Sequence, residues 1–220
     1  MTDMAVKLAI FDMDGTILDT LGDLCDSLNY VLAKQGYPVR TLDEVRSFVG
    51  NGIAKLIERA VPCDCTKEQT LGVYEEFIPY YREHCAEKTK PYDGIVKLLS
   101  DLKQNGIWLA VVSNKADAAV QDLCKQYFEG LFDIAVGECP GMEKKPAPDA
   151  VNLVLDKLHI SREEAVYIGD SEVDIATAVN SGLQLCVVDW GFRDVDFLKA
   201  HGAKRIFSDT ESLKEYLITA

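Results

Sequence analysis

Two acidic residues follow the first apolar segment of the chain at a spacing that lets their carboxylates act as a pair. Asp12 and Asp14 come directly after the apolar run at residues 6–11. Side chains alternate along a strand, so these carboxylates are expected on the same side, a few ångströms apart. At ~4 Å and an effective dielectric constant of ~20 their repulsion is about 4 kcal/mol, so a cation or the protonation of one partner must relieve it. One carboxylate would then attack as a nucleophile while the other exchanges a proton with the departing oxygen, and this division of roles suits phosphoryl transfer.

Further polar groups follow later apolar segments. The residues "SNK" at 113–115 follow one such segment, and "GDSEVD" at 169–174 carries Asp170 and Asp174 after another. Between them, the prolines of "KKPAPD" at 144–149 hold a lysine in an extended loop. Because the ligands of open parallel sheets bind beyond the carboxyl ends of the strands, we expect these groups to converge.

The converging groups have complementary tasks. A divalent cation held by Asp12 and Asp170 would keep Asp12 ionised. The ammonium of Lys145, the hydroxyl of Ser113 and the backbone amides after Asp12 would stabilise an anionic transition state. Gly15 lets the backbone approach a phosphate group closely.

The elements that must position these groups change character along the chain. Residues 6–11 are expected to form a buried strand. From Leu18 onward apolar residues recur at helical spacing, and Gly36 ends the pattern. The segments "TLDE" at 41–44 and "TKEQ" at 66–69 have the form of capping boxes that start further helices. No second strand is expected before residue 90.

From Gly94 onward, predicted strands and helices alternate. Such alternation implies a parallel sheet with right-handed crossovers. The predicted fold is therefore α/β, with a parallel-sheet core and a helical block inserted after the first strand.

The composition is that of an ordinary globular protein with an acidic surface. The chain has 220 residues, of which 48% are hydrophobic, and a formal net charge of -13. Such a charge repels nucleic acid and anionic lipid, so neither nucleic acid nor a membrane is an expected partner. The 7 cysteines form no CxxC pair, and no apolar run has the length of a signal peptide or a membrane span, so we expect a cytoplasmic protein with reduced thiols. The set Cys63, Cys65, His84 and Cys85 does not match the usual zinc-finger spacings, so no zinc site is expected.

Four short motifs, in order along the chain, resemble those of the haloacid dehalogenase superfamily of phosphohydrolases. They are "DMDGT" at 12–16, "SN" at 113–114, "KPAP" at 145–148 and "GDSEVD" at 169–174. The resemblance spans nearly the whole chain. It implies a Rossmann-like three-layer core at 1–16 and 91–220 and a helical cap domain at 17–90.

The resemblance also implies roles for individual residues. Asp12 would be the nucleophile, Asp14 the general acid and base, and Lys145 an electrostatic clamp. Mg²⁺ would be held by the side chain of Asp12, the backbone carbonyl of Asp14 and the side chain of Asp170, with support from Asp174. The implied phosphate-binding residues are Gly15, Thr16, Ser113, Asn114 and Lys145.

Two further stretches, at 45–61 and 190–194, are similar to the phosphoglycolate phosphatase branch of this superfamily. This similarity implies a Mg²⁺-dependent phosphatase that hydrolyses a small phosphate monoester, 2-phosphoglycolate, through an aspartyl-phosphate intermediate. In the cap, a substrate carboxylate would pair with basic side chains, although such residues are also typical of a solvated helix face. The candidate specificity residues there are Arg46, Gly50, Asn51, Gly52, Lys55 and Arg59.

Other functions fit the same motifs. A phosphosugar mutase of the β-phosphoglucomutase type shares both aspartates, and pyrophosphatase and nucleotidase activities also remain open. A catalytically silent binding protein on the same fold is the alternative outside enzymes. The expected assembly is a monomer or a homodimer.

Overall fold

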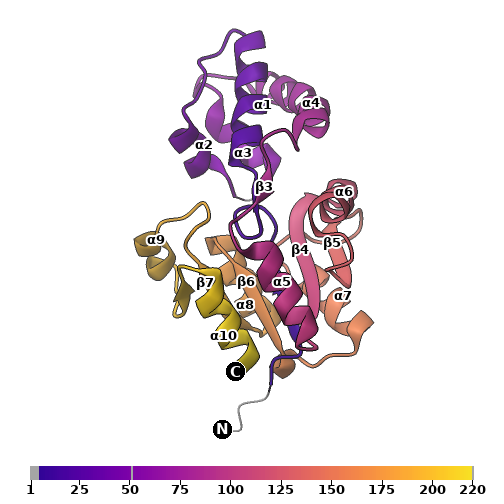
Figure 1. The fold of residues 1–220 in the computed structure, drawn as a ribbon. Helices are drawn as coiled ribbons and strands as arrows, with labels where there is room; N and C mark the ends of the chain where they lie inside the picture. The colour runs from indigo at the N-terminus through magenta and orange to yellow at the C-terminus, as the bar shows by residue number, and fades with distance from the viewer. Residues whose placement is uncertain (1–4, 51, 220) are drawn as a thin grey trace. The chain divides into compact units, whose positions relative to one another are not determined.

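The computed structural model describes residues 5–50 and 52–219 of the chain. The chain divides into two compact units. One contains the chain up to Leu18 and from Pro91 onward, and the other contains Asp19–Lys90 (Figure 1). None of the helices in the described ranges has the length and apolar character that a membrane crossing requires.

A 6-stranded sheet forms the centre of the larger unit, in the order β5-β4-β1-β6-β7-β8, and every neighbouring pair is parallel. Its strands are β1 (Leu8–Phe11), β4 (Trp108–Ala116), β5 (Ile134–Glu138), β6 (Ala165–Gly169), β7 (Gln184–Val188) and β8 (Ile206–Phe207). In this register Phe11 lies opposite Val111 of β4 and Ile168 of β6. The segments that follow these three residues therefore lie side by side at the carboxyl edge of the sheet.

Helices cover this sheet, and their bounds are α5 (Ile95–Gln104), α6 (Asp117–Phe128), α7 (Asp149–Leu158), the short 3-10 helix η1 (Arg162–Glu164), α8 (Glu172–Ser181), α9 (Val195–Ala200) and α10 (Thr210–Thr219). On one face, Leu8 and Ile10 of β1 and Tyr167 of β6 share a buried apolar cluster with Val151 of α7 and Ala178 of α8. All four residues of β1 are buried, as expected for a strand that is covered on both faces. The predicted α/β class with a parallel-sheet core is confirmed.

The smaller unit is helical, with α1 (Leu21–Lys34), α2 (Leu42–Phe48), α3 (Ile53–Ala60) and α4 (Lys67–His84). Complete capping boxes start α2 and α4, with Thr41 and Glu44 at the first and Thr66 and Gln69 at the second. Each box satisfies backbone N–H groups that would otherwise lack partners in the first helical turn. Both predicted helix starts are confirmed.

Two local predictions were wrong. The helical spacing that seemed to start at Leu18 includes a residue of β2 (Leu18–Asp19), and α1 begins only at Leu21. The backbone N–H of Leu18 donates to Met13 O and closes the tight turn that leads from β1 to β2. Strand β2 pairs with β3 (Lys90–Pro91), which contradicts the expectation of no second strand in this region.

Candidate active site

Asp12 follows β1 at the carboxyl edge of the sheet. Its backbone N–H donates to Ile168 O of β6 at 2.8 Å, which continues the β1–β6 ladder by one residue. Its side chain is buried, and Oδ1 accepts from Lys145 Nζ at 2.7 Å. The sheet therefore fixes the backbone of Asp12, and the lysine fixes one carboxylate oxygen.

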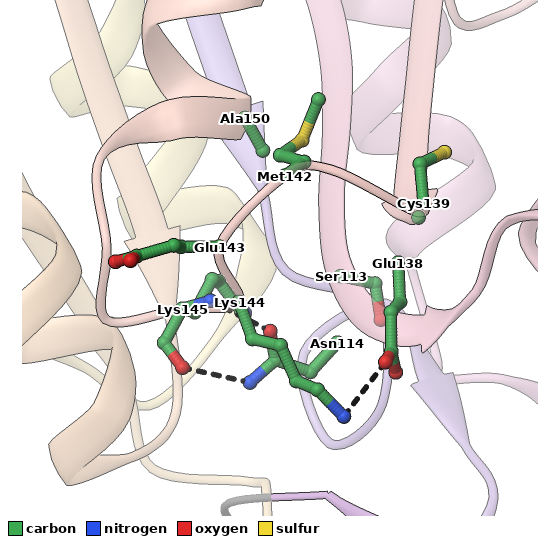
Figure 2. A pocket seen from close by; sticks show the side chains of 10 residues that line it. Ser113, Asn114, Glu138, Cys139, Met142, Glu143, Lys144, Lys145 and Ala150 are labelled. Atoms are coloured by element: carbon green, nitrogen blue, oxygen red, sulfur yellow. Dashed lines mark hydrogen bonds and ion pairs between the residues drawn. The ribbon is translucent and has the colours of Figure 1, made fainter.

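Lys145 is the cation of this site. Besides Asp12, its Nζ donates to Asp174 Oδ1 at 2.8 Å and to Tyr167 OH at 3.0 Å. The loop that carries Lys145 is held by the amide side chain of Asn114, which accepts from Lys145 N at 2.8 Å and donates to Lys145 O at 3.0 Å (Figure 2). Asn114, which the family resemblance assigned to phosphate binding, thus contacts the backbone of Lys145. A pocket of about 10 Å³ beside this loop is lined by Ser113, among others.

Asp170 follows β6 and is held from two sides. Thr16 Oγ1 donates to Asp170 Oδ1 at 3.1 Å, and Phe192 N donates to Asp170 Oδ2 at 2.8 Å. A Cβ atom added to Gly15 or to Gly191 would lie 2.4 Å from Asp170 Oδ2, so a larger residue at either position would displace this carboxylate. The hydroxyl of Thr16, another predicted phosphate ligand, contacts this carboxylate.

Asp174 stands in the first turn of α8 and caps it. Its Oδ2 accepts from Ser171 N at 3.1 Å and from Ser171 Oγ at 2.6 Å. Its Oδ1 accepts from Lys145 Nζ and, at 3.2 Å, from Tyr167 OH. Both carboxylate oxygens of Asp174 therefore have partners within the protein.

The three buried aspartates form a candidate metal site. Ligand oxygens of Asp12, Asp170 and Asp174 lie within 4.8 Å of one another. Burial, and then the negative charge of Asp174, raise the pKa of Asp12 well above its usual range, and they raise the pKa of Asp170 to about 7. Burial alone would lower the pKa of Lys145, but Asp12 and Asp174 outweigh it and hold that pKa well above its usual value. One ammonium thus faces three carboxylates, and a divalent cation with oxygen ligands fits this excess of negative charge.

Asp14 lies in the loop after β1, and Ser113 lies within the neighbouring strand β4. Asp14 Oδ1 accepts from Lys115 Nζ at 2.9 Å, and Ser113 Oγ accepts from Lys115 N at 3.1 Å. The two predicted residues are thus joined through Lys115, to which the sequence gave no role although it stands in "SNK". Its position directly after two predicted site residues was the available signal.

The loop after β7 contributes contacts that sequence reasoning also missed. Besides the Phe192 amide, Trp190 Nε1 donates to Thr16 O at 3.0 Å, and Arg193 Nε pairs with Glu172 Oε2 at 2.9 Å. The stretch at 190–194 was noted only for its similarity to one branch of a family. In the structure, this stretch donates hydrogen bonds to Asp170 and to the turn after Asp12.

The predicted specificity residues belong to the helical unit. Arg59 Nη1 donates to Phe48 O at 2.7 Å and to Gly50 O at 3.4 Å, and Lys55 pairs with Glu58 at 2.6 Å. Arg46 is in the last turn of α2, and Gly52 is the N-cap residue of α3. Asn51 lies outside the described residues. A larger hollow of about 430 Å³ in this unit is lined by Ile78, Pro79, Arg82 and Glu83, none of which the sequence selected.

The molecule is thus an α/β protein with a cluster of buried carboxylates at the carboxyl edge of its parallel sheet. Residues 9–188 match the family described as haloacid dehalogenase-like hydrolase, and the chain belongs to that family. The predicted superfamily is therefore confirmed.

Curated relatives and a solved structure agree with this assignment. Phosphoglycolate phosphatase of Vibrio parahaemolyticus is 30% identical to this chain over 224 residues, which cover 99% of this chain and 97% of that protein. Phosphoglycolate phosphatase of Neisseria meningitidis is 32% identical over 205 residues, which cover 91% and 87% of the two chains. A crystal structure of a proposed phosphoglycolate phosphatase from Lactobacillus delbrueckii subsp. bulgaricus is 41% identical, with a TM-score of 0.95, and covers 99% of this chain and 100% of that one.

Proposed function

We propose that this protein is a Mg²⁺-dependent phosphatase that hydrolyses 2-phosphoglycolate or a closely similar small phosphate monoester. The observation that carries the proposal is the ion pair of Asp12 with Lys145 inside a cluster of three buried aspartates. Relatives that align over nearly the whole chain and are named phosphoglycolate phosphatase support the substrate.

In the first half-reaction, Asp12 is the nucleophile. Lys145 holds Oδ1 of Asp12, so we assign Oδ2 to the attack on phosphorus. A bond forms between this oxygen and phosphorus while the ester P–O bond breaks, and the electron pair of that bond leaves with the alcohol oxygen. Asp14, protonated at this stage, gives its proton to that oxygen, because an alkoxide is a poor leaving group.

In the second half-reaction, Asp14 acts as a base. Its carboxylate takes a proton from water as the water oxygen attacks the phosphorus of the aspartyl phosphate. The bond between phosphorus and Asp12 breaks, which releases inorganic phosphate and restores the Asp12 carboxylate. Asp14 is then protonated for the next turnover.

The metal-binding and phosphate-binding roles divide among the remaining residues. Asp12, Asp170 and the backbone carbonyl of Asp14 would hold Mg²⁺, which neutralises charge that develops on the phosphoryl group. Asp174 supports the site through Lys145, since both of its carboxylate oxygens have protein partners. The phosphate oxygens are assigned to Lys145, to the hydroxyl of Ser113 and to the backbone around Gly15.

Two predicted phosphate ligands receive different roles in this proposal. Thr16 acts through Asp170, to which its hydroxyl donates, and Asn114 acts through the backbone of Lys145. Selection of a substrate carboxylate is assigned to the basic residues of the helical unit, Arg46, Lys55 and Arg59.

The cellular compartment, the partner and the assembly complete the proposal. The cysteines at the described positions are free thiols, which supports a reducing compartment, the cytoplasm. The partner is a small phosphorylated metabolite, and the assembly is a monomer or a homodimer.

Steady-state kinetics on a substrate panel test this proposal. The panel contains 2-phosphoglycolate, a hexose phosphate, a nucleotide and pyrophosphate, each with Mg²⁺ and again with chelator. We expect the highest kcat/KM for 2-phosphoglycolate, with no bisphosphate activator, and loss of turnover with chelator. Equal turnover with chelator would contradict the metal role, and preference for another compound would contradict the substrate.

A further inference from the structure

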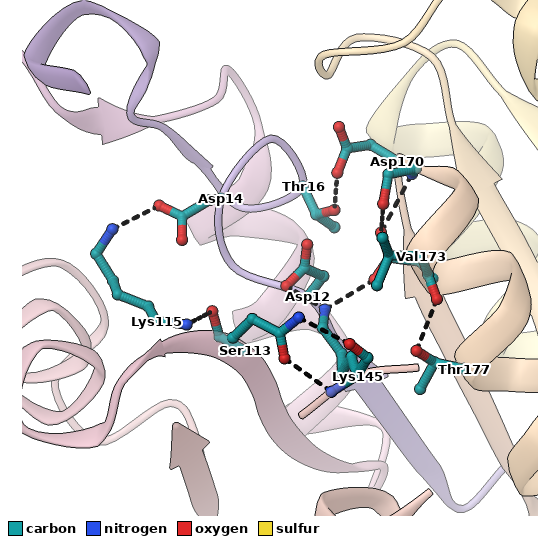
Figure 3. A network of polar contacts seen from close by, with 12 residues as sticks. Asp12, Asp14, Thr16, Ser113, Lys115, Lys145, Asp170, Val173 and Thr177 are labelled. Carbon is teal, nitrogen blue, oxygen red and sulfur yellow. Dashed lines mark hydrogen bonds and ion pairs between the residues drawn. The ribbon is translucent and has the colours of Figure 1, made fainter. Parts of the chain in front are cut away.

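The ion pair between Lys115 and Asp14 links two residues that are 101 positions apart in the chain. Their charged atoms are 2.9 Å apart, and the side chain of Lys115 is only 8% exposed. Figure 3 shows the ammonium of Lys115 directed at the carboxylate of Asp14 from the end of β4. A largely buried ammonium is costly to desolvate, so the ion pair of Lys115 with the Asp14 carboxylate calls for a functional explanation.

An irregularity in β4 presents Lys115 to Asp14. Val112 lies opposite Val136 of β5, but Ala116 lies opposite Glu138, so β4 advances four residues while β5 advances two. Such bulges re-aim side chains and are common beside active sites. The hydrogen bond from Lys115 N to Ser113 Oγ fixes the backbone within the irregular segment.

Gly137 of β5 makes room for this segment. A Cβ atom at position 137 would lie 2.7 Å from Lys115 O and 2.5 Å from Asp117 Cα, so any other residue would force the segment away from β5. The N–H of Gly137 donates to Asp117 Oδ1 at 2.8 Å, which ties the start of α6 to the same place. The path of the backbone at Lys115 is therefore specified from both sides.

We propose that Lys115 is a positioning residue for proton transfer by Asp14. Its ammonium holds Oδ1 of Asp14, which accepts this hydrogen bond whether or not the carboxyl group is protonated. Oδ2 is thereby left to carry the proton that passes to the departing oxygen, and later to accept one from water. Lys115 remains an ammonium throughout and exchanges no proton itself. The inference rests on the proposed function of Asp14.

The chemistry of the leaving group distinguishes the positioning of Asp14 by Lys115 from a structural or phosphate-binding role of Lys115. An alcohol leaving group, as in 2-phosphoglycolate, needs a proton as the P–O bond breaks, whereas nitrophenolate leaves without one. Misplacing a catalytic group by ~1 Å costs on the order of 10²-fold in rate. Loss of Lys115 should therefore lower kcat/KM for 2-phosphoglycolate far more than kcat/KM for p-nitrophenyl phosphate.

The experiment compares kcat/KM for 2-phosphoglycolate and for p-nitrophenyl phosphate in the wild type, Lys115→Met and Lys115→Arg, with Mg²⁺ present. We expect Lys115→Met to lower the value for 2-phosphoglycolate by roughly 10²-fold and that for p-nitrophenyl phosphate by less than about tenfold. Lys115→Arg should recover most of the loss, because the guanidinium restores a donor to Asp14.

Lys103→Met is the matched control. Lys103 Nζ pairs with Asp133 Oδ1 at 3.0 Å in the same unit, so this variant also loses an ion pair. The ratio of the kcat/KM values for the two substrates should nevertheless equal that of the wild type. If Lys115→Met does not fold, Lys115→Gln takes its place with the same expectation.

Other outcomes overturn the inference. An equal loss on both substrates points to a purely structural role, and a raised KM with unchanged kcat on both points to phosphate binding by Lys115. No loss on either substrate rules out any role in the reaction. A wild-type protein that hydrolyses neither substrate would instead overturn the proposed function itself.

Discussion

The Nζ atom of Lys145 lies 2.7 Å from Oδ1 of Asp12, and both side chains are buried. The same ammonium lies 2.8 Å from Asp174 Oδ1. In a region with little water, such a pair is tightly coupled, since removing either partner leaves an uncompensated charge. Lys145 therefore serves the fold and the proposed chemistry at once.

The variant Lys145→Met should lose both stability and activity. Without the ammonium, kcat/KM for 2-phosphoglycolate should fall by at least about 10²-fold. The free energy of unfolding of the metal-free protein should fall by roughly 3–5 kcal/mol. Kinetics and urea unfolding measure the two effects. Lys7→Met is the control, because the exposed side chain of Lys7 pairs with Glu164 at the surface and such surface pairs contribute little to stability. Wild-type kinetics in Lys145→Met would refute the assigned role.

The stability of the metal-free protein should depend on the ionisation of Asp170. Its pKa is raised to about 7, first by burial and then by Asp174, whereas an aspartate in an unfolded chain titrates near 3.9. Between about pH 4 and 7 the carboxyl group of Asp170 therefore keeps its proton in the folded state and loses it in the unfolded state. The stability that the neutral carboxyl group contributes is complete below about pH 4 and is lost as the pH rises through about 7.

Urea unfolding in chelator, at several pH values, measures this effect as the difference between the wild type and Asp170→Asn. The variant cannot ionise at this position, so it serves as the reference. The difference in unfolding free energy should change by a few kcal/mol between about pH 4 and 7, to the disadvantage of the wild type at the higher pH. A difference that does not vary with pH would count against the raised pKa.

Gly191→Ala should weaken metal binding without unfolding the protein. The added Cβ would lie 2.4 Å from both Asp170 Oδ2 and Gly15 O, so the carboxylate must shift. Displacing a group that supports a metal ligand typically lowers metal affinity by roughly 10- to 100-fold. The measurement is the Mg²⁺ concentration that gives half-maximal activity.

Gly72→Ala is the matched control for this substitution. Gly72 lies within α4, and an added Cβ there meets nothing within 4 Å. It should leave the Mg²⁺ requirement unchanged and raise stability by roughly 0.5–1 kcal/mol, because alanine favours the helix. An unchanged Mg²⁺ requirement in Gly191→Ala would show that the loop after β7 does not support the metal site.

The thiols should differ sharply in reactivity. Burial raises the pKa of Cys124 and of Cys186 to about 12, so little thiolate is present at neutral pH, whereas Cys63 is exposed. An aromatic disulfide reagent should label Cys63 rapidly in the native protein and reach the two buried thiols only after unfolding. Mass spectrometry of labelled peptides identifies the sites, and early labelling of Cys124 would disprove the buried assignment.

Much of the architecture could be predicted because periodicity and capping act locally. The apolar strand before Asp12 and the boxes at Thr41 and Thr66 each depend on neighbouring residues only. The convergence of Asp12 with Asp170 then follows from parallel pairing, which brings the ends of β1 and β6 together. These inferences need no knowledge of packing.

The remaining features depend on contacts between distant segments. Whether Lys115 reaches Asp14 depends on the irregular register of β4, and the need for glycine at position 191 depends on how closely a later loop approaches Asp170. The hydroxyl of Thr16 likewise has its partner 154 positions away. Short strands such as β2 are set by tertiary pairing and have no repeating pattern long enough to detect.

The most direct test of the account is to trap the phosphorylated enzyme. The wild type is mixed with 2-phosphoglycolate and Mg²⁺, quenched in acid within a single turnover, digested and analysed by mass spectrometry. We expect one phosphoryl group on the peptide that contains Asp12, located on that residue, and none in Asp12→Asn. Turnover with phosphate on another residue, or undiminished turnover by Asp12→Asn, would contradict the central claim.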